Sequence, residues 1–255
     1  MTSEDERSLG KFRHALAEQG DLEGALASVD QCIEKRPRDG LLYRERAHLH
    51  LYLGQTQQAR SDFDTTERLA AEVFRTRPGR LQSNGAFDAI GVTYWMEGHR
   101  ELARAFWRYT TCSLSMNRVG YAQMGGGIES GLLLWFGAVL ERNEKDVELV
   151  RTFYEKRLAS KHWSHNLTSW PGPVVQFFFK SIDDATLIDN AAGHHQQLCD
   201  AHFALAIRAR EMGRHKVYWE RLKLAAPRKG AQEIYEFYNV LPYFLARFEI
   251  EQSGR

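Results

Sequence analysis

The amino-acid sequence predicts an all-α fold, a right-handed superhelix of helical hairpins with a capping helix at its C-terminal end. A unit of roughly 34 residues recurs along the chain. Residues 39–71 form its clearest copy, in which Gly54 separates two helical stretches. Only 6 of the 255 residues are proline, and helix-favouring residues are frequent. Residues 234–251 end the pattern with a helical stretch that is rich in aromatic side chains.

The copies share three positions: a turn glycine, a residue where the two helices cross, and a bulky residue where one hairpin meets the next. These triplets are Gly20, Ala25 and Val29; Gly54, Ala59 and Phe63; Gly98, Ala103 and Trp107; and Gly213, Tyr218 and Leu222. A hairpin cannot bury its apolar side alone, so it packs against its neighbours. Glycine adopts the left-handed conformation that ends a helix. The pattern resembles the tetratricopeptide repeat (TPR) family, which implies a binding scaffold and specifies no activity.

The repeats suggest four segments in order. Residues 1–74 hold repeats one and two, and residues 75–85 form a loop with Pro78 and two glycines. Residues 86–159 hold repeat three and a degenerate repeat four, with helices expected at 130–141 and 145–159. Residues 160–255 hold a Trp-Pro-Gly-Pro turn, short helices, repeat five and the capping helix.

The last segment contains three expected helices besides repeat five. One covers residues 174–179, and Ser181 with Asp184 indicates the start of another. Pro242 is expected to kink the terminal helix. Because apolar groups surround that helix, we expect it to be buried, with a homodimer surface as the alternative.

From about residue 130 to 248 the order of features resembles the C-terminal part of the bacterial lipoprotein NlpI. The resemblance rests on Trp135, Trp170, residues 175–179, Ile182, Leu187, the repeat at 198–226 and residues 238–248. It implies an adaptor that docks enzymes of envelope maintenance. The first residues lack a signal-peptide pattern and a lipid-bearing cysteine. We therefore expect a cytoplasmic protein, or a periplasmic one if a signal or lipid anchor has been removed.

The composition argues against several classes of partner. Lys and Arg number 34 against 33 Asp and Glu, a balance that predicts no nucleic-acid binding and no attraction to membrane surfaces. No apolar run approaches the roughly 18 to 20 residues of a membrane span. Cys32, Cys112 and Cys199 lack metal-type spacing, which favours buried thiols in a reducing compartment.

Partner-binding residues are predicted on the first helix of each hairpin, which lines the concave face in the TPR family. They are Lys11, His14, Arg44, His48, Tyr52, Asp88, Val92, Trp95 and Met96. This surface suits a peptide with an acidic end and an apolar anchor. The alternative is that Trp95 and Met96 pack inside the superhelix. One TPR subfamily binds a terminal carboxylate with Lys, Asn and Arg, a pattern that is absent here.

No catalytic residue, cofactor or metal is predicted. His162, His165, His194 and His195 would be needed for a metal-dependent enzyme, but no cysteine or carboxylate cluster completes a ligand set. The pair Asp183–Asp184 is interpreted as charge at a helix start. The expected function is a non-catalytic protein–protein interaction module: an adaptor, scaffold or inhibitor. The alternatives are an immunity-type protein that blocks a toxin or enzyme, the metal-dependent enzyme, and a structural homo-oligomer.

Overall fold

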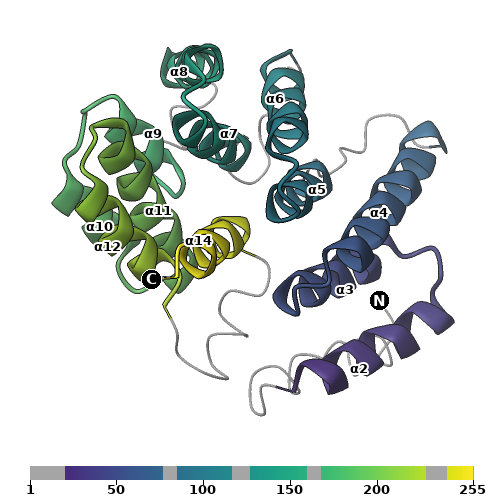
Figure 1. Ribbon diagram of the computed structural model, residues 1–255. Coiled ribbons are helices and arrows are strands. Elements are labelled where there is room, and N and C mark those ends of the chain that lie inside the picture. Colours follow the sequence, from purple (N-terminus) through teal and green to yellow (C-terminus); the bar gives the residue numbers. More distant parts are fainter. Residues whose placement is uncertain (1–20, 77–84, 117–126, 160–167, 228–239, 255) are drawn as a thin grey trace. The chain divides into compact units, whose positions relative to one another are not determined.

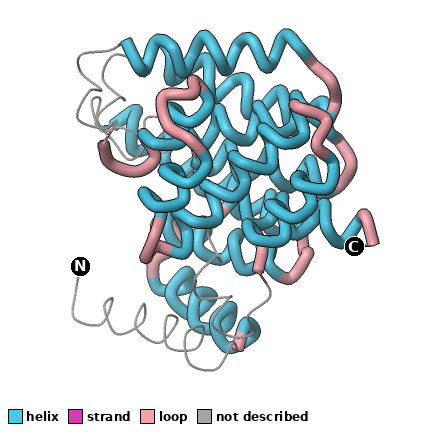
Figure 2. The backbone as a smooth tube through the Cα atoms, turned by 90° about the vertical axis from the view of Figure 1, so that its left-hand side faces the viewer, coloured by secondary structure: helices cyan, strands magenta, loops and turns pink. Residues whose placement is uncertain are grey.

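The computed structural model describes residues 21–76, 85–116, 127–159, 168–227 and 240–254. Within these ranges every regular element is a helix, which confirms the all-α class (Figures 1 and 2). None of the helices in this part of the chain is long and apolar enough to cross a membrane. The chain divides into two compact units: unit 1 is Met1–Glu97 with Pro227–Leu241, and unit 2 is Gly98–Ala226 with Pro242–Arg255.

Unit 1 contains the hairpin that the clearest repeat predicts. Its helices are α2 (Leu22–Lys35), α3 (Gly40–Tyr52), α4 (Thr56–Thr76) and α5 (Gly85–Met96). Gly54 has a φ of +74° in the turn between α3 and α4, and the Gln55 amide donates to the His50 carbonyl at 2.8 Å. Ala59 and Phe63 are fully buried, as the repeat positions require. The local turn and the packing positions therefore agree with the sequence.

Packing and charge together hold α2 against this hairpin. Ala25 and Val29 of α2 belong to one apolar cluster with Leu42 and Leu49 of α3. Arg46 of α3 donates to Asp30 of α2 at 2.6 Å and to both carboxylate oxygens of Asp62 of α4, at 2.7 and 2.8 Å. The hydrogen bonds with Asp62 and Asp30 raise the pKa of Arg46. One guanidinium group thus connects three helices.

Unit 2 contains two further hairpins. Its helices are α6 (Arg100–Met116), α7 (Ile128–Leu140), α8 (Glu144–Ala159), α9 (Gly172–Phe178), α10 (Asp184–Ala191), α11 (His195–Glu211), α12 (His215–Ala225) and α14 (Leu241–Gln252). Helices α7 and α8 pack together as the degenerate repeat, and α11 and α12 as repeat five. Gly213 has a φ of +70°, and Tyr218 and Leu222 are buried at the predicted positions.

A buried carboxylate joins α6 to α8, the second helix of the α7–α8 hairpin. Asp146 at the start of α8 accepts from Arg104 at 2.6 Å and from Arg108 at 2.7 and 2.9 Å, and its own amide donates to Asn143 at 3.0 Å. Asp146 and Arg104 are both buried, and Glu101 is a second partner of Arg104. Charge-assisted hydrogen bonds of this kind are stronger than neutral ones, so they fix α8 against α6.

The short helix α9 is held by aromatic contacts. Phe178 stacks on Trp135 of α7 with ring centroids 4.1 Å apart, and Tyr154 of α8 donates to the Ile128 carbonyl at 2.8 Å. Just before α9, the indole N–H of Trp170 donates to Asp200 of α11 at 3.0 Å. Burial raises the pKa of Asp200 to about 7.

Several helix ends differ from the predicted bounds by one or two residues, as in α7, α8 and α9, and the starts of α10 and α14 differ for clear physical reasons. The predicted start at Ser181 is wrong by two residues, because Asp183 is the N-cap of α10 and accepts from the Thr186 amide at 2.8 Å. Asp183 competes better than Ser181 because its carboxylate also carries the charge that a helix N-terminus favours. Pro242 lies in the first turn of α14, where a missing N–H is tolerated. Residues 234–239 of the predicted terminal helix lie outside the described part.

Candidate functional site

The predicted binding residues of α3 differ in exposure. Arg44 and Tyr52 are half-buried, and the Arg44 guanidinium lies 3.6 Å from Glu45. His48 is buried and meets the Phe63 ring edge to face, with centroids 5.2 Å apart. Burial and the neighbouring Arg44 charge lower the pKa of His48 to about 3, so this ring is neutral at physiological pH. Arg44 and Tyr52 keep surface that a partner could contact.

The predicted residues of α5 are mostly internal. Asp88, Val92 and Trp95 are buried, and Met96 is half-buried. Asp88 lies near Glu67 of α4, whose pKa rises to about 7 because of burial and the charges of Asp88 and Asp64. Side chains in this position contribute mainly to packing within unit 1. Lys11 and His14 lie outside the described residues.

The histidines of the metal alternative are only partly placed. His194 and His195 are exposed at the start of α11, while His162 and His165 lie outside the described residues. Among the residues that the structure describes, no group of three or more His, Cys, Asp and Glu side chains could hold a metal ion. The described histidines alone therefore form no metal centre.

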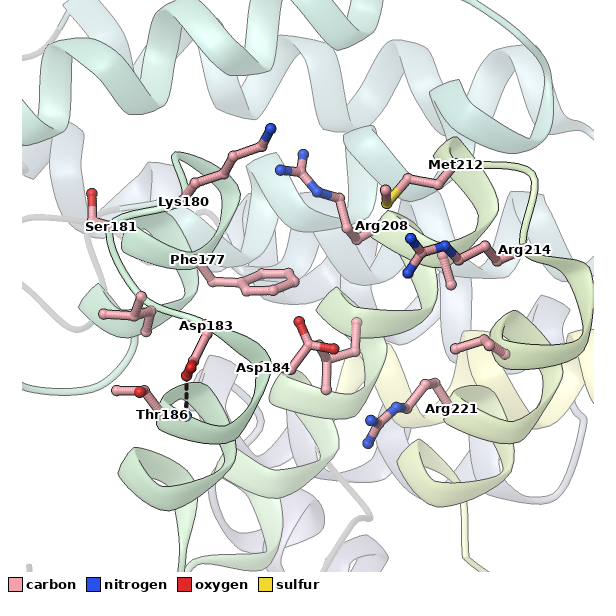
Figure 3. Close-up of a pocket in the computed structure, with 14 residues that line it drawn as sticks. Phe177, Lys180, Ser181, Asp183, Asp184, Thr186, Arg208, Met212, Arg214 and Arg221 are labelled. Carbon is pink, nitrogen blue, oxygen red and sulfur yellow. Dashed lines mark hydrogen bonds between the residues drawn. The ribbon is translucent and has the colours of Figure 1, made fainter.

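A cavity of about 680 Å³ opens in unit 2, and none of the predicted binding residues lines it (Figure 3). Its walls come from the end of α9, the start of α10, α11 and α12. Apolar lining is provided by Phe177, Ile182, Leu205, Ala209, Met212 and Val217, and polar lining by Lys180, Ser181, Asp183, Asp184, Thr186, Arg208, Arg214 and Arg221. The volume is within the range of ligand sites in proteins. Four cationic and two anionic side chains give the lining a positive balance.

Lys180 occupies a backbone position that normally favours glycine. Its φ is +58°, and it follows the last residues of α9 as the left-handed residue of a Schellman turn. The Lys180 amide donates to the Phe177 carbonyl at 3.0 Å, and the Ser181 amide donates to the Gln176 carbonyl at 2.9 Å. This turn directs the exposed Lys180 side chain to the cavity (Figure 3).

Arg214 occupies another helix end that favours a different residue. It is the N-cap of α12, and its side chain makes no capping hydrogen bond. A guanidinium group has donors only, so it cannot accept from the free amides of the first turn. The turn itself is closed by the Arg214 amide, which donates to the Ala209 carbonyl at 2.8 Å.

The four cations of the cavity differ in how they are paired. Arg208 lies 3.4 Å from Glu211, which also binds Arg151 at 2.7 Å. Arg221 lies 3.5 Å from His202 Nδ1, where burial and the Arg221 charge lower the pKa of His202 to about 4.

Lys180 and Arg214 make no side-chain hydrogen bond or ion pair with any other residue that the structure describes. In Figure 3, both lie on the same side of Asp184 as Arg208, and Arg221 lies on the other side. Their positive charges therefore remain available in an open cavity.

The two carboxylates of the lining have different roles. Asp183 caps α10, and hydrogen bonds from the side chain and amide of Thr186 lower the pKa of Asp183. Asp184 is exposed and lies among the lining side chains (Figure 3). A ligand that enters must therefore place anionic groups near Lys180 and Arg214 and away from Asp184.

Sequence reasoning did not identify this cavity. Its residues lie between positions 177 and 221 on separate elements that only the tertiary fold brings together. Two local signals were present in the sequence: lysine at the end of a short apolar helix and arginine directly after the turn Gly213. Each is ordinary alone, and their convergence is visible only in the structure.

Comparisons with known proteins identify no family for this chain. No protein-family description and no curated protein matches it. The crystal structure of the P58(IPK) TPR domain aligns with 99% of this chain and 67% of that chain, at 16% identity and a TM-score of 0.38. At this identity and TM-score, the all-α class is established by the helices of the chain itself. The resemblance to NlpI remains a sequence-based expectation.

Proposed function

We propose that this protein is a non-catalytic interaction module that binds a protein or peptide through exposed side chains of its helical hairpins. The observation that carries the proposal is the cavity of unit 2, where available cations adjoin exposed apolar groups. Met212 is 55% exposed and Val217 is 37% exposed at its rim. Apolar anchors contribute most of the energy of an interface, while charged groups set orientation.

The chemistry of the lining favours binding over catalysis. The described lining residues include no histidine and no cysteine, and Asp183 is already used as a helix cap. A hydroxyl such as Ser181 needs a general base within hydrogen-bond reach to become a nucleophile. The cations instead offer a fixed charge to an anionic group.

The binding surface that the sequence predicts on unit 1 is a second part of the proposal. Arg44, Tyr52 and Met96 are the predicted binding residues there that retain some exposure among those the structure describes. Trp95 is fully buried, so its replacement by alanine would create a cavity and report on stability. Arg44→Glu is the more informative variant for that surface.

The proposal is tested by affinity capture from an extract of the source cells, followed by mass spectrometry. Wild type, Met212→Glu, Leu224→Glu and Arg44→Glu are compared in parallel. Leu224 is a matched control because it lies on α12 with 52% exposure and does not line the cavity. We expect a partner that is retained by Leu224→Glu and lost by Met212→Glu.

Other outcomes have defined meanings. Loss with Arg44→Glu alone would move the site to unit 1. No specific partner with any variant would contradict the interaction module.

A further inference from the structure

We propose that the unit 2 cavity binds an acidic peptide segment with an apolar side chain, and that Lys180 and Arg214 bind its carboxylates. This inference rests on the proposed function and specifies the ligand of the same cavity. It concerns side-chain carboxylates within a segment, because Lys180 and Arg214 come from two different turns and each can bind a separate carboxylate.

The first argument is the local backbone chemistry of the two cations. Lys180 has a positive φ at a position where glycine is preferred, and Arg214 is an N-cap where Ser, Asp or Asn is preferred. Both residues therefore depart from the favoured chemistry of a helix end. Departures of this kind are expected where function requires a particular side chain. Here both side chains line one cavity.

The second argument is the state of the charges. Elsewhere in unit 2 the buried Arg104 and the half-buried Arg108 are both paired with Asp146. Lys180 and Arg214 have no such partner among the described residues. An ammonium group and a guanidinium group form their strongest hydrogen bonds with carboxylates or phosphates. Lys180 and Arg214 are exposed, so an anionic ligand could reach both side chains and pair with them.

The third argument is the apolar part of the lining. Phe177, Leu205 and Ala209 are buried and form part of the wall, whereas Met212 and Val217 are exposed. Methionine packs adaptably against varied apolar groups. An apolar side chain next to the ligand's carboxylates would cover this surface.

The carboxylates of the lining select a peptide over a nucleic acid. Asp183 and Asp184 lie in the same wall as the cations. A phosphate backbone carries a charge on every nucleotide and would bring some of it close to them, whereas a peptide can place its carboxylates only near the cations. The only aromatic side chain of the described lining is Phe177, which is buried, so the wall presents no exposed ring on which a base could stack.

The ligand class is tested by selection from a displayed library of random peptides against the full chain. The peptides are fused at their carboxyl ends, so that only side-chain carboxylates are offered. Wild type should enrich peptides with acidic and apolar residues, and Lys180→Gly and Arg214→Ser should lose the acidic enrichment. Neutral or basic consensus peptides, no enrichment, or unchanged acidic enrichment in both variants would overturn the inference.

Two matched variants separate binding from folding. Arg142 has a φ of +54° in the turn between α7 and α8 and does not line the cavity. Arg142→Gly therefore removes the same charge from the same kind of turn as Lys180→Gly. His194 is an exposed N-cap of α11 without a capping hydrogen bond, so His194→Ser matches Arg214→Ser.

Affinities are measured by fluorescence anisotropy with an enriched peptide and compared with urea midpoints. All four variants should keep or raise the unfolding midpoint. Only Lys180→Gly and Arg214→Ser should weaken binding, each by about tenfold. Lys180→Asn, which tolerates a positive φ, should behave like Lys180→Gly. Equal affinities for all variants, or tighter binding of a short polyuridine RNA, would contradict the proposal.

These results also separate the inference from the proposed function. If Met212→Glu abolishes capture of a cellular partner while no acidic peptide binds, the interaction module stands and the ligand class is wrong. If acidic peptides bind while no partner is captured, the cavity chemistry stands and the adaptor role fails.

Discussion

Among the residues that the structure describes, left-handed turn positions are occupied by glycines or by long cationic side chains. Gly54, Gly98 and Gly213 have positive φ, as do Arg142 and Lys180. The left-handed conformation costs a residue with a Cβ roughly 1 to 2 kcal/mol. The two cationic turns therefore store a free-energy cost that the glycine turns avoid.

That cost gives a prediction for stability. Arg142→Gly and Lys180→Gly should each raise the free energy of unfolding by about 1 kcal/mol, because strain is relieved by more than glycine's added chain entropy. Urea denaturation followed by circular dichroism measures the change. Gly54→Ala is the converse control and should destabilise by a similar amount. Destabilisation by both cation-to-glycine changes would show that the side chains contribute more than the strain costs.

Gly131 lies inside a helix, where a close approach to a neighbouring side chain requires glycine. A Cβ at Gly131 of α7 would lie 2.7 Å from Cε1 and 2.9 Å from Oη of Tyr154. Tyr154 is fully buried, and its hydroxyl bond to Ile128 fixes the ring. The ring cannot move aside without losing this bond and its packing.

Gly131→Ala should therefore destabilise the protein by about 1 to 3 kcal/mol, measured by thermal melting. Gly40→Ala is the comparison, because a Cβ there meets its nearest atom at 3.5 Å. That change should be neutral or stabilising in a helix. Equal melting of Gly131→Ala and wild type would contradict the close-contact explanation.

At the scale of elements, hairpins were predictable because their signals are local. A turn glycine, a helix-crossing position and a bulky seam residue recur in fixed order, and Ala59, Phe63, Tyr218 and Leu222 are buried accordingly. Helix starts were less predictable, since Ser181 and Asp183 both favour an N-cap. The structure selects Asp183.

The face that each helix exposes was harder to predict. Apolar and polar residues surround α3 and α5 without a clear stripe, so the 3.6-residue period does not select an exposed side. His48 and Asp88 are polar yet buried, against the usual preference of their residue types. The cavity could not be predicted, because four separate elements form it.

The joint between α6 and α8 can be tested at Asp146. Asp146→Asn should destabilise the protein by about 3 kcal/mol, because the amide nitrogen faces guanidinium donors and leaves buried Arg104 without a full counter-charge. Chemical denaturation gives the value. Glu144→Gln, an exposed change in the same helical turn, should change stability by less than about 0.5 kcal/mol. An Asp146→Asn effect as small as the control would show that the ion pairs contribute little.

At the scale of the whole molecule, each unit contains ionisable groups whose contributions to stability change with pH in opposite directions. The pKa values of Glu67 in unit 1 and Asp200 in unit 2 are raised to about 7, whereas those of His48 and His202 are lowered to about 3 and about 4. A raised carboxyl pKa costs stability as pH rises from about 4 to about 7. A lowered histidine pKa costs stability as pH falls below about 6.5. The contributions offset each other between these limits.

This offset predicts a nearly flat stability profile between about pH 4 and 6.5 for wild type. Asp200→Asn should raise stability by about 1 to 2 kcal/mol at pH 8, because it removes a carboxylate that burial disfavours, with allowance for its partial exposure. The variant should then lose stability on acidification, because the destabilising effect of His202 at low pH is no longer offset by Asp200. Urea midpoints at a series of pH values measure both effects. A variant profile parallel to that of wild type would contradict this assignment.

The hydrogen bond from Trp170 to Asp200 also gives the protein an intrinsic optical sensor. Indole emission responds to a nearby charge, and this carboxyl group changes charge at about pH 7. Tryptophan fluorescence of the native protein should therefore change with a midpoint near pH 7, and Trp170→Phe or Asp200→Asn should abolish the change. Trp95, Trp107 and Trp135 are buried and Trp219 is half-buried, and Trp170→Phe separates their emission from that of Trp170. Through this single contact, light emission would report proton binding at one carboxyl group without an added label.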